Sequence, residues 1–363
     1  MLGIVTLATV FAVTVSAVPL LSRQAERFGL VDEPGGRKDH ACAVPLIGGI
    51  AIFLGVSVGA AAMPALPPML VGALLGMAGY VLLGCLDDRI PLGGAVKLAI
   101  QVAIATAVVV GFGGAIPSLG DLFGTGPIAL AAPWSHAFAV FVIVGLVNAV
   151  NMADGVDGLA AGVVLIALFW LSVAAELNGV PQTVGFSLLL GAGVTGFLLF
   201  NYRSPICGRA VVFLGDAGSM MLGFAIAWLG ISVLAAVEGP VTPAGMGWIV
   251  ALPAVDTLSL MVRRIRRGRS PFSADREHLH HVFLLAGFSP IATTNILIGL
   301  ELFLGGFGVV GCWAGVPDVV LFGFLLPFVM AHGFFVYRAW RTMKALKRIR
   351  RMRPVRARFR APW

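Results

Sequence analysis

The chain has 363 residues, of which 59% are hydrophobic and only 12% are charged. Its mean hydropathy of +0.97 lies far above that of water-soluble proteins, so the composition excludes a soluble domain and indicates a polytopic membrane protein. The formal net charge is +8. The four cysteines are scattered without a Cys-x-x-Cys pair, which argues against both a zinc site and a disulfide framework.

Apolar runs long enough to cross a bilayer recur along the whole chain. We predict an all-α polytopic integral membrane protein with about eleven transmembrane helices. The first run has no basic residues before it, so we interpret it as a retained helix and not as a cleaved signal peptide. The predicted helices cover residues 2–21, 45–63, 69–86, 96–113, 133–149, 158–176, 184–201, 217–236, 245–262, 291–312 and 318–338.

The positions of the basic residues predict how these helices are oriented. If the loop after the first helix is cytoplasmic, all 25 lysines and arginines fall on the cytoplasmic side, as the positive-inside rule requires. The N-terminus is then outside and the C-terminus cytoplasmic. We expect a transmembrane domain over residues 1–338 and a basic cytoplasmic tail over residues 339–363. Anionic lipid explains the charge of this tail better than nucleic acid does.

Acidic residues at the cytoplasmic ends of the predicted helices are the first candidates for chemistry. Asp87 and Asp88 close the third helix, and Asp216 opens the eighth. Adjacent acids point in different directions on a helix, so both can face one site only where the helix ends. A one-sided cluster of carboxylates suggests a divalent-cation site facing the cytosol. The alternative for the first pair is an ordinary helix end neutralised by Arg89.

The segment from Asn148 to Leu159 places two amides and two carboxylates directly after the fifth apolar run. Polar side chains are costly at a membrane border, so we expect these to bind a ligand or take part in chemistry. Its two acids are three residues apart and would share one face of a helix that starts here, where free N–H groups favour a phosphate. An N-cap with a glycine turn explains one of the acids but not both. The four residues are Asn148, Asn151, Asp154 and Asp157.

Two basic segments supply further candidates. His278, His280 and His281 lie in an arginine-rich loop that lacks a second ligand pair at zinc-finger spacing, so contact with phosphate or sugar is the better interpretation. In the first predicted cytoplasmic loop, Lys38 and His40 are positioned to meet a diphosphate, and topology-setting charge is the alternative.

Two acids lie within predicted helices and have no assigned role. For Asp256, a helix–helix hydrogen bond and a functional role remain equally open. For Glu301 we favour the structural interpretation.

Together these segments resemble the polyprenyl-phosphate N-acetylhexosamine-1-phosphate transferase family. The matching segments occur in family order and span residues 28–40, 45–49, 86–88, 148–159, 213–219 and 275–281. Members transfer a sugar 1-phosphate from a UDP-sugar to a membrane polyprenyl phosphate and release UMP. The His-x-His-His order resembles the branch that uses UDP-N-acetylglucosamine. The sequence after His281 disfavours the branch that makes the first lipid intermediate of peptidoglycan. The first acidic motif departs from the family pattern, because Arg89 follows the pair and no third acid is close by.

The resemblance implies an Mg²⁺-dependent enzyme of the bacterial inner membrane, with Mn²⁺ as a second candidate ion and the active site on the cytoplasmic face. It would transfer N-acetylglucosamine 1-phosphate from UDP-N-acetylglucosamine to undecaprenyl phosphate and so start an envelope glycan. Another UDP-N-acetylhexosamine is the alternative donor, a homodimer remains open, and no nucleic acid is expected.

The same resemblance implies a role for each candidate residue. Asp216 would hold the metal ion, Asp157 would read the uracil edge, and Phe213 would stack on the uracil ring. The catalytic group comprises Asp87, Asp88, Asp154, Asp157 and His281. The substrate-binding group comprises Lys38, His40, Asn148, Asn151, Asn201, Phe213, Arg276, His278 and His280.

Two other classes explain parts of the pattern. An ion-coupled transporter predicts acids deep within the helices and an internal repeat, whereas most acids here lie at helix ends. A CDP-alcohol phosphotransferase expects an arginine and two further spaced acids after its Asp-Gly pair, and the residues after Gly158 lack them. Within the favoured class, direct attack by the lipid phosphate and a two-step route through an aspartyl intermediate at Asp87 or Asp88 both remain open.

Overall fold

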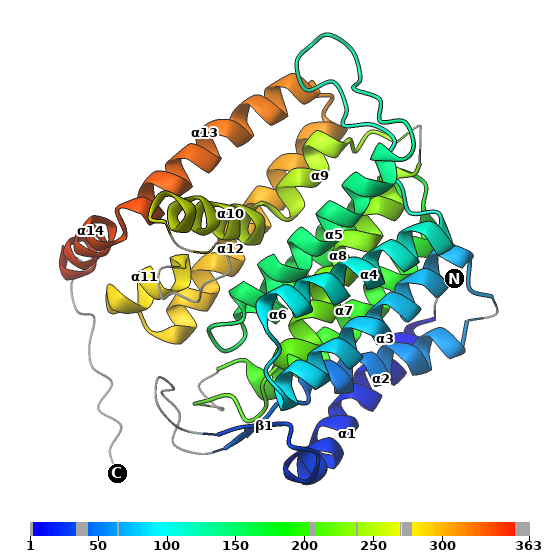
Figure 1. Cartoon of the computed structure of the whole chain (residues 1–363), viewed down its shortest axis with the longest axis vertical. Helices are drawn as coiled ribbons and strands as arrows, with labels where there is room; N and C mark the ends of the chain where they lie inside the picture. Colours follow the sequence, from blue (N-terminus) through cyan, green and yellow to red (C-terminus); the bar gives the residue numbers. More distant parts are fainter. Residues whose placement is uncertain are drawn as a thin grey trace.

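The structure is a computed structural model that describes residues 3–33, 43–63, 65–203, 208–236, 239–268, 270 and 278–352 (Figure 1). Most of this part of the chain is helical, because a helix pairs every backbone N–H and C=O group within its own segment in a medium without water. The all-α prediction needs one small correction in the described residues. Strands β1 (Val31–Asp32) and β2 (Val44–Pro45) form a short antiparallel pair.

Nine helices of the described residues are long and apolar enough to cross a membrane. Each of the eleven predicted runs coincides with one of these helices, with the shorter helix α2 (Gly48–Ala61), or with a bent pair of helices. The polytopic helical architecture is therefore confirmed, while the count of eleven spans and their orientation stay predictions. The nine helices are α1 (Ile4–Phe28), α3 (Pro68–Arg89), α4 (Gly94–Phe112), α5 (Trp134–Ala153), α6 (Leu159–Leu177), α7 (Pro181–Asn201), α8 (Gly215–Leu234), α12 (Pro290–Trp313) and α13 (Asp318–Tyr337).

The predicted span over residues 245–262 is a bent pair. Helix α9 (Pro243–Ile249) meets helix α10 (Ala251–Arg266) at an angle of 82°. Pro253 explains the break, because a proline ring clashes with the carbonyl group four residues earlier, which here belongs to the last residue of α9. The short helix α11 (Leu279–Leu285) and the basic helix α14 (Ala339–Met352) complete the fold at the left of Figure 1.

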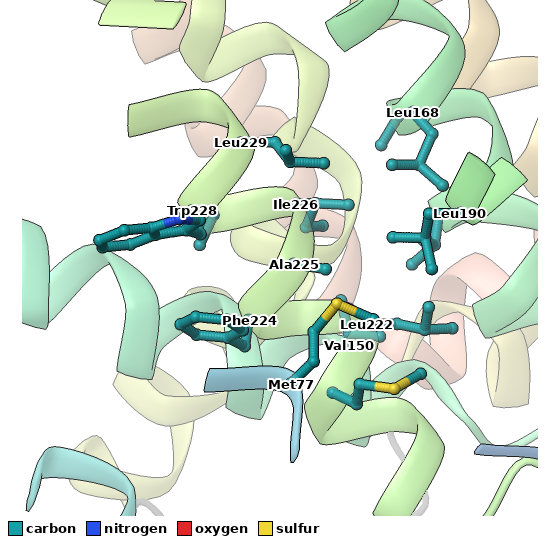
Figure 2. Close-up of a cluster of buried hydrophobic side chains, with 14 of the residues drawn as sticks. Met77, Val150, Leu168, Leu190, Leu222, Phe224, Ala225, Ile226, Trp228 and Leu229 are labelled. Atoms are coloured by element: carbon teal, nitrogen blue, oxygen red, sulfur yellow. The ribbon is translucent and has the colours of Figure 1, made fainter. Parts of the chain in front are cut away.

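Helix α8 is the central helix of the bundle, and nearly all of its residues are buried. Figure 2 shows Phe224 and Trp228 on one side of α8, with Leu168 of α6 and Leu190 of α7 on the other. Because protein surrounds α8, its neighbours and not lipid determine the position of its first turn, which carries Asp216.

The close packing of α3 against α8 brings two acidic segments together. A Cβ atom at Gly84, in the last part of α3, would lie 2.2 Å from the backbone of Ala217, so only glycine permits this approach. The end of α3 therefore meets the beginning of α8. Because small residues let α3 and α8 cross closely, Asp87 and Asp88 lie near Asp216.

Candidate active site

Three charged side chains from three helices form the centre of the site. The Lys97 ammonium at the start of α4 lies 2.7 Å from Asp87 Oδ2 and 2.6 Å from Asp216 Oδ2. The exposed fractions of the side chains are 16% for Lys97, 11% for Asp87 and 31% for Asp216, so the cluster is largely buried but reaches solvent at Asp216. The backbone N–H of Leu92 also donates to Asp87 Oδ1 over 2.7 Å.

Asp88 joins the end of α3 to the start of α8. Its two carboxylate oxygens accept the backbone N–H groups of Asp216 and Ala217, at 3.0 and 3.3 Å. Gly215 has a φ of +72°, and a Cβ atom there would lie 2.8 Å from Asp88 Oδ2, so both its conformation and its space require glycine. The positive end of the α8 dipole stabilises the Asp88 carboxylate in this position.

Two asparagines of α5 border the acids. Asn151 Nδ2 donates to Asp216 Oδ1 over 2.7 Å and to Ser219 Oγ over 2.9 Å. Asn148 Nδ2 donates to Gln101 Oε1 over 2.7 Å, one helical turn beyond Lys97 on α4. The amides therefore orient the metal-binding candidate Asp216 and connect α5 to α4.

The two acids after α5 lie in a turn and not on a helix. Asp154 is the residue that ends α5, and α6 begins only at Leu159. The expectation that Asp154 and Asp157 share one face of a helix starting here is therefore wrong. Gly155 and Gly158, which lie between the end of α5 and the start of α6, favour a turn over a helix.

The environment of Asp154 is strongly negative. The residue is exposed to solvent, but many protein atoms lie around its carboxyl group and limit its hydration. This desolvation, together with the charges of Asp216, Asp88 and Asp157, raises the pKa of Asp154 to about 8. The described residues of the site therefore carry an excess of negative charge, which favours the binding of a cation.

Asp157 and Asn201 attach the turn to the segment after α7. Asp157 Oδ2 accepts Arg203 Nε over 2.5 Å and the N–H of Ala210 over 3.2 Å. Asn201 Oδ1 accepts the N–H of Gly158 over 2.7 Å. The residue proposed for uracil stacking lies in the same segment, where the backbone N–H of Phe213 donates to the Pro45 carbonyl over 2.9 Å. Uracil recognition by Asp157 and Phe213 stays a prediction.

The histidine segment lies against the same turn. A Cβ atom at Gly155 would be only 2.4 Å from His280 Nε2, so this glycine leaves the room that the imidazole occupies. The ring centroid of His280 lies 5.5 Å from that of His278 and 4.3 Å from that of His281. Burial and the neighbouring histidines His281 and His278 lower the pKa of His280 to about 3, so His280 is neutral at cellular pH. The imidazole of His280 therefore lines the site as a neutral group and not as a cation.

Three predicted site residues, Lys38, His40 and Arg276, lie outside the described residues. In the opposite direction, the structure adds Lys97 and Gln101, which sequence reasoning left out of the site. They are four residues apart and share one face of an otherwise apolar helix, and this spacing is the signal that could have found them. By the positive-inside rule alone, Lys97 counts only as one of the 25 basic residues that predict the topology.

The donor atoms of the cluster suit a hard divalent cation. No three histidine, cysteine or acidic side chains of the described residues converge as a complete metal cage. Mg²⁺ does not need one, because it commonly takes one or two carboxylates and fills its octahedron with water and substrate phosphates. The ammonium of Lys97 between Asp87 and Asp216 shows that these carboxylates already accommodate a cation.

Comparisons with known proteins agree with the motifs. The family described as glycosyl transferase family 4 matches residues 70–234, a range that holds the acids of the cluster but not the histidine segment. The chain is 31% identical over 350 residues to undecaprenyl-phosphate alpha-N-acetylglucosaminyl 1-phosphate transferase of Escherichia coli, which covers 95% of this chain and 94% of that protein. The Salmonella typhimurium protein of the same name is 31% identical over 348 residues, covering 95% and 94% of the two chains. A probable undecaprenyl-phosphate N-acetylglucosaminyl 1-phosphate transferase of Bacillus subtilis is 34% identical over 299 residues, covering 79% and 77%.

Proposed function

Because this chain belongs to glycosyl transferase family 4, we propose that it transfers N-acetylglucosamine 1-phosphate from UDP-N-acetylglucosamine to undecaprenyl phosphate and releases UMP. The names of its relatives in Escherichia coli and Bacillus subtilis support this reaction. The observation that carries the proposal is a cluster of acids at the ends of helices. Asp87 and Asp216 contact Lys97, Asp88 accepts the N–H of Asp216, and Asp154 lies close enough to feel the charges of Asp216 and Asp88. Another UDP-N-acetylhexosamine is the alternative donor.

The position of the cluster suits two substrates of different solubility. Helix ends lie near the membrane surface, where the phosphate of a polyprenyl lipid and a water-soluble nucleotide sugar can meet. The positive-inside rule predicts that the same end of the protein faces the cytoplasm, and we propose that the membrane is the bacterial inner membrane. A cytoplasmic site is also where a nucleotide sugar is available.

Charge balance supports a requirement for Mg²⁺. The donor brings a diphosphate to a site that is itself rich in carboxylates, so repulsion opposes binding unless a cation intervenes. We assign Asp216 as the protein ligand, oriented by Asn151. When bound there, Mg²⁺ neutralises the diphosphate and lowers the cost of charge developing during in-line displacement.

The contacts of Asp87 and Asp88 favour direct attack by the lipid phosphate. Asp87 is held by Lys97 and a backbone N–H, and Asp88 is held by two N–H groups of α8, so both carboxylates already have partners. The acceptor phosphate is anionic near neutral pH and needs no strong base. Its oxygen forms a bond to the β-phosphorus while the bond to UMP breaks and leaves its electron pair on the UMP phosphate. We therefore assign the two acids to positioning the site and not to covalent catalysis.

A donor panel tests the proposed function. Purified protein with Mg²⁺ and undecaprenyl phosphate is incubated with each common UDP-N-acetylhexosamine, and UMP is measured. We expect release with UDP-N-acetylglucosamine and its loss in EDTA. Absence of UMP with every donor would refute the assignment. Exchange of labelled UMP into the donor without lipid would instead establish the two-step route.

A further inference from the structure

A second buried carboxylate lies behind the histidine segment. Asp256 of α10 is 8% exposed. Its Oδ2 lies 2.8 Å from His278 Nδ1, and its Oδ1 accepts the backbone N–H of Leu279 over 3.1 Å. One side chain therefore holds both the imidazole of His278 and the first residue of α11.

A histidine from a distant helix supports this carboxylate from the other side. His332 of α13 is 6% exposed, and its Nε2 lies 3.3 Å from Asp256 Oδ1, close enough for an ion pair although outside hydrogen-bond geometry. The other ring nitrogen, Nδ1, lies 3.1 Å from Ser259 Oγ. Ser259 is less than one turn beyond Asp256 on α10, so His332 bridges two residues of that helix.

The contact with Asp256 determines what His278 can offer to a ligand. A carboxylate beside Nδ1 holds the proton on that nitrogen and fixes the plane of the ring, which leaves Nε2 available for other partners. The next histidine in the segment, His280, packs on Gly155 beside the acidic turn. The Asp256 contact thus sets where the segment begins, and the contact with Gly155 sets where it meets the site.

The histidine segment borders a small pocket. This pocket of about 30 Å³ is partly open to solvent, and its lining includes Asp256, Leu279 and His280. His280 Nε2 is buried and has no hydrogen-bond partner in the described residues. The His280 side chain therefore does not anchor the segment by a hydrogen bond, whereas two polar contacts to Asp256, from His278 and Leu279, restrict it.

We propose that Asp256 and His332 are positioning residues that hold the segment from His278 to His281 against the acidic site, so that His278 presents Nε2 to the donor. The part of this inference that concerns the donor rests on the proposed function. Neither Asp256 nor His332 lies in the range matched by the family, residues 70–234. The histidines touch substrate in this scheme, while Asp256 and His332 act only through them.

Chemical modification of His278 tests the anchor without relying on catalysis. Diethyl pyrocarbonate modifies accessible imidazoles, and mass spectrometry of the full-length protein in detergent gives the rate at His278. We expect Asp256→Asn and His332→Gln to raise this rate. Loss of a carboxylate that orients a metal-bound histidine lowers metal affinity or activity by about 10- to 100-fold. By analogy, we expect both variants to raise the KM for UDP-N-acetylglucosamine by about tenfold and to leave the KM for undecaprenyl phosphate unchanged.

Glu301→Gln is the matched control, because Glu301 is another buried acid, on α12, and its carboxylate forms no hydrogen bond with a histidine of the described residues. It should change neither the His278 rate nor the donor KM. Unchanged modification and unchanged donor KM in Asp256→Asn and His332→Gln would overturn the inference. If Asp256→Asn does not fold, His332→Gln decides alone. If no donor yields UMP, the proposed function fails, while the modification rates still decide whether Asp256 and His332 hold the segment.

Discussion

Carboxylates occupy two contrasting settings in this protein. At the ends of α3 and α8, Asp87 and Asp216 share one lysine, Lys97, Asp88 accepts two backbone N–H groups, and Asp216 keeps contact with solvent. Beside α13, Asp256 is nearly inaccessible to solvent, and its carboxylate contacts two histidines and one backbone N–H group.

The difference between these settings is a difference in charge balance. Among the residues that the structure describes, the first set has more acids than nearby cations, and uncompensated like charges are costly unless a further cation joins them. In the second set, one acid has as many partners as its oxygens need, so it requires no ligand. Excess negative charge therefore marks where a ligand binds, whereas a carboxylate whose oxygens already have protein partners marks where the protein holds its own parts in place.

The largest expected effect is at the acid assigned to the metal ion. Asp216→Asn should abolish turnover, a loss of at least about 1000-fold, because an amide cannot supply the anionic ligand. UMP release measures the loss, and thermal unfolding in detergent checks that the variant is folded. Near-normal activity in a folded variant would remove Asp216 as the metal ligand and weaken the contrast between the two settings.

Removal of the lysine tests whether excess charge really destabilises the first setting. Lys97→Met leaves Asp87 and Asp216 without their shared cation, and breaking a buried pair costs about 3–5 kcal/mol, less here because Asp216 is partly exposed. We expect the unfolding temperature in EDTA to fall by several degrees and Mg²⁺ to raise it more than in the natural protein. Lys97→Arg, which keeps the charge, is the control. An equal response of both variants to Mg²⁺ would show that charge excess does not drive cation binding.

Gly155→Ala tests the contact between the acidic turn after α5 and the histidine segment. The added Cβ would lie 2.4 Å from His280 Nε2 and must displace it, at a cost of about 1–3 kcal/mol. We expect a donor KM about tenfold higher, measured by UMP release. Gly145→Ala, on the same stretch of chain but with no atom within 4 Å of its added Cβ, should leave the donor KM unchanged. Equal KM values for the two variants would separate the histidine segment from the donor site.

The smallest effect concerns pH. The pKa of Asp154 is raised from 3.8 to about 8, so the folded state binds this proton more tightly than the unfolded state does. The stability that the proton contributes is complete below about pH 4 and is lost as the pH rises through 8. In EDTA, the unfolding temperature between pH 6 and pH 9 should therefore fall more steeply for the natural protein than for Asp154→Asn. Parallel curves would show that Asp154 does not carry the excess charge of the site.

The positions of the helices could be predicted because they depend on local properties. An apolar run in a bilayer must form a helix to satisfy its own backbone, so composition alone located α3, α5 and α8 and placed Asp87 and Asp216 at their ends. The turn after Asn151 was predicted less well. The i, i+3 spacing of Asp154 and Asp157 fits a helix, but Gly155 and Gly158 delay the start of α6 to Leu159.

The amino-acid sequence by itself determined the membrane class, the helical segments and the types of residue available for chemistry, since hydropathy and motif order are properties of short stretches. Only the tertiary structure decided which of these residues meet. Lys97 and Asp216 are 119 positions apart, and the close approach of α3, α4 and α8 joins them. Asp256 meets His332 because the break before α10 turns that helix toward α13. Both pairings depend on how helices pack, which no local pattern encodes.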